Sequence, residues 1–126
     1  MKADIVILID DNPTTLFYNE DVINEIYPNV EVVTYENSEK ALNNFLELKY
    51  NDKNILMFLD INMPDYTGYE MLAEIDDEIE DIDNLKVVML TSSKMKSDTE
   101  KATRFTQIIG YIEKPLTVDK IKATIK

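Results

Sequence analysis

Near the middle of the chain stands Ile55-Leu56-Met57-Phe58-Leu59-Asp60-Ile61-Asn62-Met63-Pro64. A short apolar run that is bounded by turn signals is typical of a buried strand in a parallel sheet. Because proline cannot continue a strand ladder, the strand must end by Met63. Asp60 is therefore expected at the carboxyl end of this strand, where open α/β sheets bind their ligands. A carboxylate in that position is costly unless another group compensates its charge.

The length and composition indicate one soluble globular domain that spans residues 1–126. The chain has 126 residues, of which 44% are hydrophobic and 30% are charged, as is usual for such a domain. It contains no cysteine and no histidine. This excludes disulfides, metal sites built on thiolates or imidazoles, and nucleophiles activated by histidine. No apolar stretch is long enough for a signal peptide or a membrane span, so we expect a cytoplasmic protein.

The net charge of −12 is distributed unevenly along the chain. Residues 1–85 carry 4 lysines against 21 acids, a net of −17, whereas residues 86–126 carry 9 basic residues against 4 acids, a net of +5. So acidic a chain opposes direct binding to nucleic acid, which needs basic surface over most of the contact. The acidic excess favours solubility, and a site that gathers carboxylates around a cation would add to it.

The remaining elements can be placed by their apolar patterns and cap residues. We expect strands at residues 4–9, 30–34, 55–60, 86–90 and 107–112, and helices that begin after Asn12 and at residues 37–38, 67–70, 97–100 and 117. The helix from residue 97 is expected to run to about Phe105. The acidic segment 74–83 predicts a frayed helix end followed by a solvated loop. The apolar helix faces comprise Leu16, Ile23, Ile26 and Tyr27, then Ala41, Leu42, Phe45 and Leu46, then Met71, Leu72 and Ile75.

Strand and helix thus alternate five times, which predicts a parallel sheet covered on both faces and joined by right-handed crossovers. The chain has only two glycines, so a glycine-rich loop that cradles a nucleotide is excluded. We found no internal repeat, linker or low-complexity segment.

The carboxyl ends of parallel strands lie at one edge of the sheet, and polar residues follow four of the five strands. The first strand leads to Asp10 and Asp11, the central strand to Asp60, the fourth to Thr91 and the fifth to Lys114. Three neighbouring carboxylates would repel one another. Oxygen ligands without histidine or cysteine point to Mg²⁺ or a similar hard cation.

A carboxylate that is flanked by such a cation, an ammonium and a hydroxyl is suited to holding a phosphoryl group. Asp60 can itself be the nucleophile, which gives an aspartyl phosphate. Each residue has an ordinary alternative when it is taken alone. Asp10-Asp11 is more often a helix cap, Thr91 an ordinary strand end, and Lys114-Pro115 a surface turn. Their coincidence at one edge of the sheet favours the site.

Asp10-Asp11, Asp60 to Pro64 with Gly68, Thr91, and Lys114-Pro115 together resemble the signature of receiver domains of bacterial two-component response regulators. The resemblance covers essentially the whole chain. It implies a flavodoxin-like (βα)₅ fold, a doubly wound parallel sheet of five strands in the order 2-1-3-4-5. It also implies transfer of a phosphoryl group onto Asp60 from a histidine kinase or a histidine phosphotransfer protein.

The resemblance also implies a role for each residue of the site. Asp11 and Asp60 would bind Mg²⁺ or Mn²⁺ directly, Asp10 would act through water, and Asn62 would contribute its backbone carbonyl. Thr91 and Lys114 would contact the phosphoryl group. Tyr111 matches the aromatic residue that swings inward together with Thr91 on activation, and Ser92 keeps the small residue that phosphate access requires. Thr67 departs from the family pattern, which commonly has aspartate there.

Three other functions can be weighed against the residues alone. A magnesium-dependent phosphatase with an aspartate nucleophile needs a second acid two residues after the nucleophile, and that position is Asn62. A flavin carrier shares the fold class but needs a phosphate loop after the first strand, where Asp10 and Asp11 would repel phosphate. A receiver-like module that binds partners without being phosphorylated is the other alternative. The receiver reading makes the chain a signalling module that acts only on its own phosphorylation and dephosphorylation, not an enzyme.

The basic C-terminal third predicts an output surface. We expect the face formed by the fourth helix, the fifth strand and the fifth helix to dock an acidic downstream protein or a second copy of the chain. The alternative is an ordinary solvated helix face. The basic residues of this region are Lys94, Lys96, Lys101, Arg104, Lys120 and Lys122.

Overall fold

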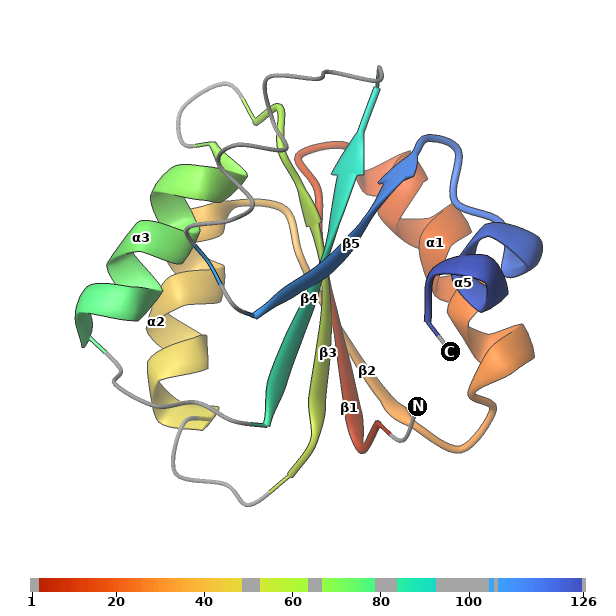
Figure 1. Cartoon of the computed structure of the whole chain (residues 1–126), viewed down its shortest axis with the longest axis horizontal. Helices are drawn as coiled ribbons and strands as arrows, with labels where there is room; N and C mark the ends of the chain where they lie inside the picture. The colour runs from red at the N-terminus through yellow and green to blue at the C-terminus, as the bar shows by residue number, and fades with distance from the viewer. Residues whose placement is uncertain are drawn as a thin grey trace.

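The computed structural model of the chain describes residues 3–48, 53–63, 67–78, 84–92, 105 and 107–125. Its centre is a parallel sheet of five strands in the order β2-β1-β3-β4-β5 (Figure 1). The strands are β1 (Ile5–Ile9), β2 (Glu31–Tyr35), β3 (Ile55–Asp60), β4 (Leu85–Thr91) and β5 (Ile108–Glu113). The described helices are α1 (Pro13–Ile26), α2 (Ser38–Leu48), α3 (Gly68–Glu78) and α5 (Val118–Thr124). The predicted strand order and doubly wound fold are confirmed.

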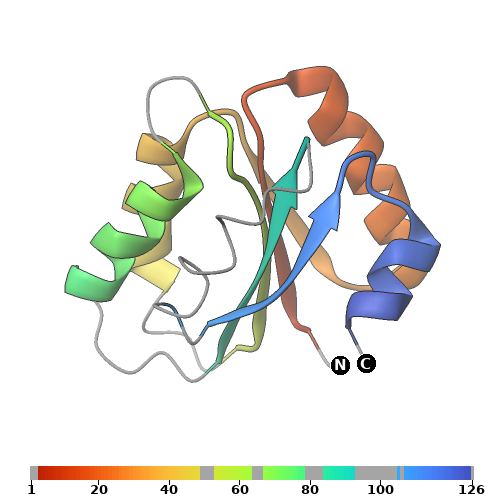
Figure 2. The same cartoon turned by 45° about the horizontal axis from the view of Figure 1, so that its top comes forward.

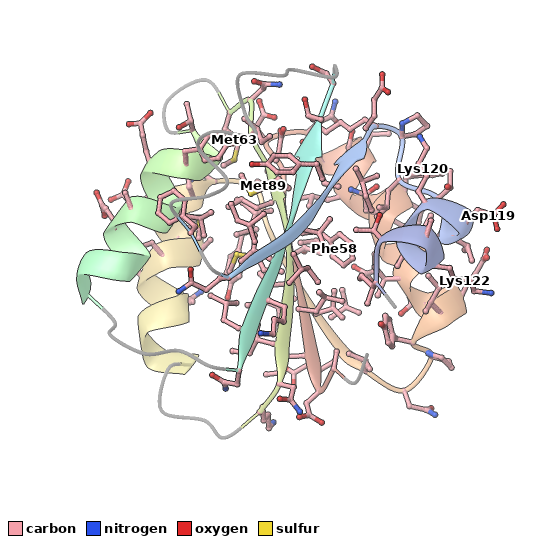
Figure 3. All side chains as sticks on the ribbon, in the orientation of Figure 1. Phe58, Met63, Met89, Asp119, Lys120 and Lys122 are labelled. Carbon is pink, nitrogen blue, oxygen red and sulfur yellow. The ribbon has the colours of Figure 1, made fainter. Side chains whose placement is uncertain are left out.

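The sheet is buried on both sides because helices cover both of its faces. Helices α2 and α3 lie on one face, and α1 and α5 lie on the other (Figure 1). Side chains of a strand point alternately to the two faces, so Phe58 of β3 packs on the α1–α5 side, whereas Met89 of β4 packs on the α2–α3 side (Figure 3). Every residue of β1 and β3 is buried, which explains why both strands are continuous apolar runs.

The carboxyl ends of the strands lie at one edge of the sheet, as the arrowheads in Figures 1 and 2 show. The chain turns quickly from this edge into the helices because side chains cap the helix starts. Asn12 Oδ1 accepts hydrogen bonds from the backbone N–H groups of Thr14 and Thr15, at 2.9 and 3.2 Å. Thr67 and Glu70 form the predicted capping box, in which each side chain accepts from the other residue's N–H at 3.2–3.3 Å.

Most element boundaries differ from the predicted ones by one residue, as strand ends commonly do. One difference is larger: α3 continues to Glu78 and so includes the first five residues of the acidic segment 74–83, in which we expected fraying to begin. The helix predicted from residue 97 lies outside the described residues, apart from Phe105, which is buried and not helical. None of the helices in the described ranges combines the length and the apolar character that a membrane span needs.

Candidate functional site

Two buried carboxylates stand at the carboxyl ends of the neighbouring strands β1 and β3. The exposed fraction is 1% for Asp10 and 2% for Asp60. In each case the following turn supplies a backbone donor. The N–H of Asn12 donates to Asp10 Oδ1 at 2.9 Å, and the N–H of Asn62 donates to Asp60 Oδ1 at 3.1 Å. The second oxygen of each carboxylate, Oδ2, is thereby directed away from the turn and toward one partner that the two carboxylates share.

That partner is the ammonium of Lys114, which lies between the two carboxylates. Its Nζ is 2.9 Å from Asp10 Oδ2 and 3.3 Å from Asp60 Oδ2. Lys114 follows β5, and its backbone N–H donates to the carbonyl of Thr91 at 2.7 Å. This bond continues the pairing of β4 with β5 by one residue, so the sheet itself positions the lysine at the edge.

Burial is the largest cause that raises the pKa of the Asp60 carboxyl above its ordinary value of 3.8, and the charge of Asp10 adds to the rise. The Asn62 hydrogen bond and Lys114 lower this pKa only in part. Burial by itself lowers the pKa of Lys114, but the hydrogen bond to Asp10 and the charges of Asp60 and Asp10 outweigh it, so that pKa is raised. The two raised pKa values are consistent with each other. Lys114 has two anionic partners, which favour its charged form, whereas Asp60 has to share the one ammonium with the anion of Asp10.

Asp11 brings a third carboxylate to the same place. It is exposed, and one oxygen from each of Asp10, Asp11 and Asp60 lies within 4.8 Å of the others. Three carboxylates exceed the single charge of Lys114, so the cluster is undercompensated on the side that faces solvent. This oxygen-only set fits a hard divalent cation such as Mg²⁺.

Thr91 and Ser92 complete the edge from the β4 side. Thr91 is the last residue of β4 and is 5% exposed. The side-chain amide of Asn62 donates to Ser92 Oγ at 3.3 Å, which ties the turn after β3 to the turn after β4. The predicted residues Asp10, Asp11, Asp60, Asn62, Thr91 and Lys114 therefore gather at one edge.

Gly68 at the start of α3 allows close approach to the end of β3. A Cβ atom on Gly68 would lie 3.0 Å from the carbonyl oxygen of Asp60 and 3.1 Å from the end of the Met89 side chain. The backbone N–H of Gly68 also donates to the carbonyl of Ile61 at 3.2 Å. A larger residue there would need the Asp60 carbonyl or the neighbouring side chains to shift by a few tenths of an ångström.

Tyr111, the predicted switch residue, is partly buried in β5 and packs against the core on the α2–α3 side. Its hydroxyl lies 2.7 Å from the hydroxyl of Tyr69 in α3. Sequence reasoning missed Tyr69, because nothing in the spacing of the two tyrosines indicates that α3 and β5 meet.

An open groove of about 540 Å³ adjoins the carboxylate cluster between α1 and the loop from β5 to α5. Lys114 and Ser92 line it on the side of the cluster. The rest of the lining comprises Thr14, Thr15, Tyr18, Asn19, Pro115 and Leu116. Sequence reasoning also missed the buried Asn19. Its position, three residues after Leu16 and four before Ile23, was a usable signal, because it falls on the apolar face of α1.

Solved structures similar to this chain include response regulators. A two-component response regulator from Cytophaga hutchinsonii has 27% identity and a TM-score of 0.86, with 98% of this chain and 95% of that chain covered. One from Legionella pneumophila has 25% identity and a TM-score of 0.74, with the same coverage. A chemotaxis protein from Vibrio cholerae, 18% identical with a TM-score of 0.77 and 98% and 97% coverage, shares the fold. The comparison with curated proteins gave no match.

The family comparison covers nearly the whole chain. A family model of the response regulator receiver domain matches residues 6–126. The cluster of Asp10, Asp11 and Asp60 fits the phospho-accepting site of that family, and receiver domains generally bind Mg²⁺ at an acidic pocket of this kind. The chain belongs to the response regulator receiver domain family and functions in phosphorelay signalling.

Proposed function

We propose that Asp60 is the residue that accepts the phosphoryl group. The observation that carries the proposal is the way the two buried carboxylates differ. Both oxygens of Asp10 make 2.9 Å contacts, to Asn12 and to Lys114. The contacts of Asp60 are longer, 3.1 Å to Asn62 and 3.3 Å to Lys114. Burial also raises the pKa of Asp60 above its ordinary value, so its carboxylate is more basic than that of a solvent-exposed aspartate. Asp60 is thus the better nucleophile of the two.

In the proposed reaction an oxygen of Asp60 attacks phosphorus while the bond from phosphorus to the leaving group breaks. The leaving group keeps the electron pair of that bond. We assign the attack to Oδ2, because the Asn62 N–H occupies Oδ1. Lys114 then pairs with a phosphoryl oxygen, and Thr91 donates its hydroxyl to another. The hydrogen bond from Asn62 to Oδ1 holds the carboxylate in position during the attack.

Asp10, Asp11, Asp60 and the backbone carbonyl of Asn62 are the groups that would hold Mg²⁺ or Mn²⁺. The bound ion supplies positive charge against the phosphoryl oxygens. The protein itself orients the carboxylates, because the backbone N–H groups of Asn12 and Asn62 hold one oxygen of Asp10 and one of Asp60. Asn62 makes the phosphatase alternative unattractive, since its amide cannot serve as a general acid.

The proposed phosphodonor is a histidine kinase or a histidine phosphotransfer protein in the cytoplasm, and the proposed output is a protein partner or a second copy of the chain. We place the output on the face of the fourth helix, β5 and α5, with Tyr111 as its switch. Lys122 is exposed on α5, where Figure 3 shows it pointing away from the sheet. Lys120 is less free, because its Nζ donates to the carbonyls of Glu113 and Pro115 at 2.9 and 3.0 Å.

We infer a single domain that acts only on its own phosphorylation state.

The test of Asp60 as the phosphoacceptor is intact mass spectrometry after incubation with acetyl phosphate and Mg²⁺. The wild type should gain one phosphoryl group, and Asp60→Asn should gain none. Asp21→Asn is the matched control, because Asp21 is an exposed aspartate of α1; it should behave as the wild type does. Phosphorylation of Asp60→Asn at the wild-type rate would refute the assignment. A wild type that never reacts would favour the alternative of a module used without phosphorylation.

A further inference from the structure

Lys120 is a lysine in the first turn of α5 whose ammonium turns back to the preceding loop. Its Nζ donates to the carbonyl of Glu113 at 2.9 Å and to the carbonyl of Pro115 at 3.0 Å. These two residues flank Lys114, whose own ammonium contacts both buried carboxylates of the site. One side chain of α5 thus holds the backbone on both sides of the lysine that compensates those carboxylates.

The peptide group that links Glu113 to Lys114 is held at both of its ends. Its N–H, that of Lys114, donates to the carbonyl of Thr91 in β4 at 2.7 Å. In a trans peptide the N–H and the C=O point in opposite directions, so the carbonyl of Glu113 faces away from β4. Strand β5 is the last strand of the described sheet, and an edge strand leaves such carbonyls without a strand partner. Lys120 supplies the partner that the sheet does not.

The residue that follows Lys114 cannot fasten the loop by a donor of its own, because Pro115 has no backbone N–H. Lys120 contributes the donor instead, at the carbonyl of Pro115. The backbone N–H of Lys120 also donates to the cap residue of α5, Thr117 Oγ1, at 3.2 Å. The side chain and the backbone of Lys120 together therefore join the loop to the helix at three oxygen atoms.

Helix formation does not account for a lysine at this position, because a positive charge in the first turn opposes the helix dipole. Lys40 offers a comparison within the same chain. It is the third residue after the cap residue Asn37 of α2, and its N–H donates to Asn37 Oδ1 at 2.8 Å. The side chain of Lys40 is exposed, whereas Lys120 is half-buried and lies beside the loop in Figure 3. The contact with the loop is what distinguishes Lys120.

We propose, on the basis of the phosphotransfer function above, that Lys120 is a positioning residue that fixes the backbone of Lys114 for contact with the phosphoryl group on Asp60. The ammonium of Lys114 has to exchange a carboxylate oxygen for a phosphoryl oxygen during the reaction. A long side chain makes this exchange at a lower cost in conformational entropy when its backbone stays in place. Lys120 itself acts through the loop, because the contacts of its ammonium are with backbone carbonyls.

Beryllium fluoride with saturating Mg²⁺ is the probe for the phosphoryl position. Lys120→Met keeps most of the apolar stem and removes the ammonium, and we expect it to bind beryllium fluoride about 3- to 10-fold more weakly, the effect of about one hydrogen bond. Mg²⁺ alone should not bind more weakly, since carboxylates would hold it. Lys120→Arg keeps several N–H donors and should recover most of the affinity. Lys40→Met is the matched control and should bind as the wild type does.

Hydrogen exchange of single backbone amides reports on the loop itself. The N–H of Lys114 belongs to the peptide group that Lys120 holds, so in Lys120→Met it should exchange about 3- to 10-fold faster. The N–H of Ile125 donates to the carbonyl of Ile121 at 2.8 Å at the other end of α5, and it should exchange at the wild-type rate. A general loosening of α5 would instead accelerate both amides.

Faster exchange at Lys114 together with weaker binding of beryllium fluoride supports the proposal. Unchanged binding of beryllium fluoride overturns it, and so does weaker binding without faster exchange at Lys114. An equal loss of affinity for Mg²⁺, or faster exchange at Ile125 as well, also overturns it, because the variant then weakens the fold as a whole. A wild type that binds no beryllium fluoride is a different result, since the proposed phosphotransfer function itself then fails.

Discussion

The hydroxyl groups of Tyr69 and Tyr111 lie 2.7 Å apart and join the first turn of α3 to the strand β5. Tyr69 is 9% exposed and directly follows Gly68, whose backbone packs on the end of β3 beside the Asp60 carbonyl. Tyr111 precedes Lys114 by three residues on β5. The hydrogen bond therefore connects the β3–α3 side and the β5 side of the proposed phosphorylation site, on a path that does not pass through Thr91.

This bond should hold Tyr111 in the position it has without phosphate. Tyr69→Phe removes this hydrogen bond, so the inward rotation proposed for the Tyr111 side chain becomes easier. We therefore expect the variant to bind beryllium fluoride about 2- to 5-fold more tightly than the wild type does. Titration followed by NMR of the tyrosine rings measures the affinity. Tyr27→Phe, at the C-terminal end of α1, is the control and should bind as the wild type does. Equal or weaker binding by Tyr69→Phe contradicts the idea.

Asp60→Asn should stabilise the protein when Mg²⁺ is absent. Burial raises the pKa of Asp60 above its ordinary value of 3.8, so the charged form is less favourable in the folded state than in the unfolded chain. A carboxyl whose pKa is higher in the folded state contributes its full stability to the folded wild type below pH 3.8, where it is protonated in both states. That contribution is lost as the pH rises through the folded pKa and the buried group becomes charged. At neutral pH the variant should melt a few degrees higher, about 3–5 °C for each kcal/mol removed.

The gain of Asp60→Asn should shrink as the pH is lowered toward 3.8, because the wild-type carboxyl then also becomes neutral. Melting curves in EDTA between neutral and acid pH check both statements. The exposed Asp21 again offers a control, since Asp21→Asn should show no such trend. A neutral-pH melting temperature of Asp60→Asn below that of the wild type would count against the prediction.

Removal of Asp11 should weaken the response to Mg²⁺ far more than it weakens the fold. Asp11 is exposed, so Asp11→Ala loses little packing, but the cluster loses one of three oxygens that lie within 4.8 Å. We expect Mg²⁺ to raise the melting temperature of the wild type and to leave that of Asp11→Ala nearly unchanged. Calorimetric scans over a series of Mg²⁺ concentrations measure this. The prediction fails if both proteins gain equally from the metal.

Lys114→Gln should destabilise the metal-free protein, because it leaves Asp10 and Asp60 buried without their cation. Breaking a buried ion pair costs about 3–5 kcal/mol, and the side chain of Lys114 is 27% exposed, so we expect a loss of about 2–3 kcal/mol. Mg²⁺ should recover part of it by compensating the same carboxylates. Urea unfolding with and without Mg²⁺ tests both parts, and Lys122→Gln on exposed α5 is the control.

The sequence by itself determined the parallel sheet, its double cover of helices and the gathering of Asp10, Asp60, Thr91 and Lys114 at one edge. These follow from local patterns, because an apolar run defines each strand and every parallel strand ends on the same side. The order of the strands came from the family resemblance, since periodicity alone does not distinguish one order from another.

Only the tertiary structure decided how these side chains pair. The contacts of Lys114 with both carboxylates, the bond between Tyr69 and Tyr111, and the burial of Asn19 beside a groove depend on distances between elements far apart in the chain. Such distances are set by the packing of the helix layers on the sheet, to which all elements contribute at once. A local pattern can place a residue on a face or at an edge, but the neighbour that it meets there depends on the packing of the whole domain.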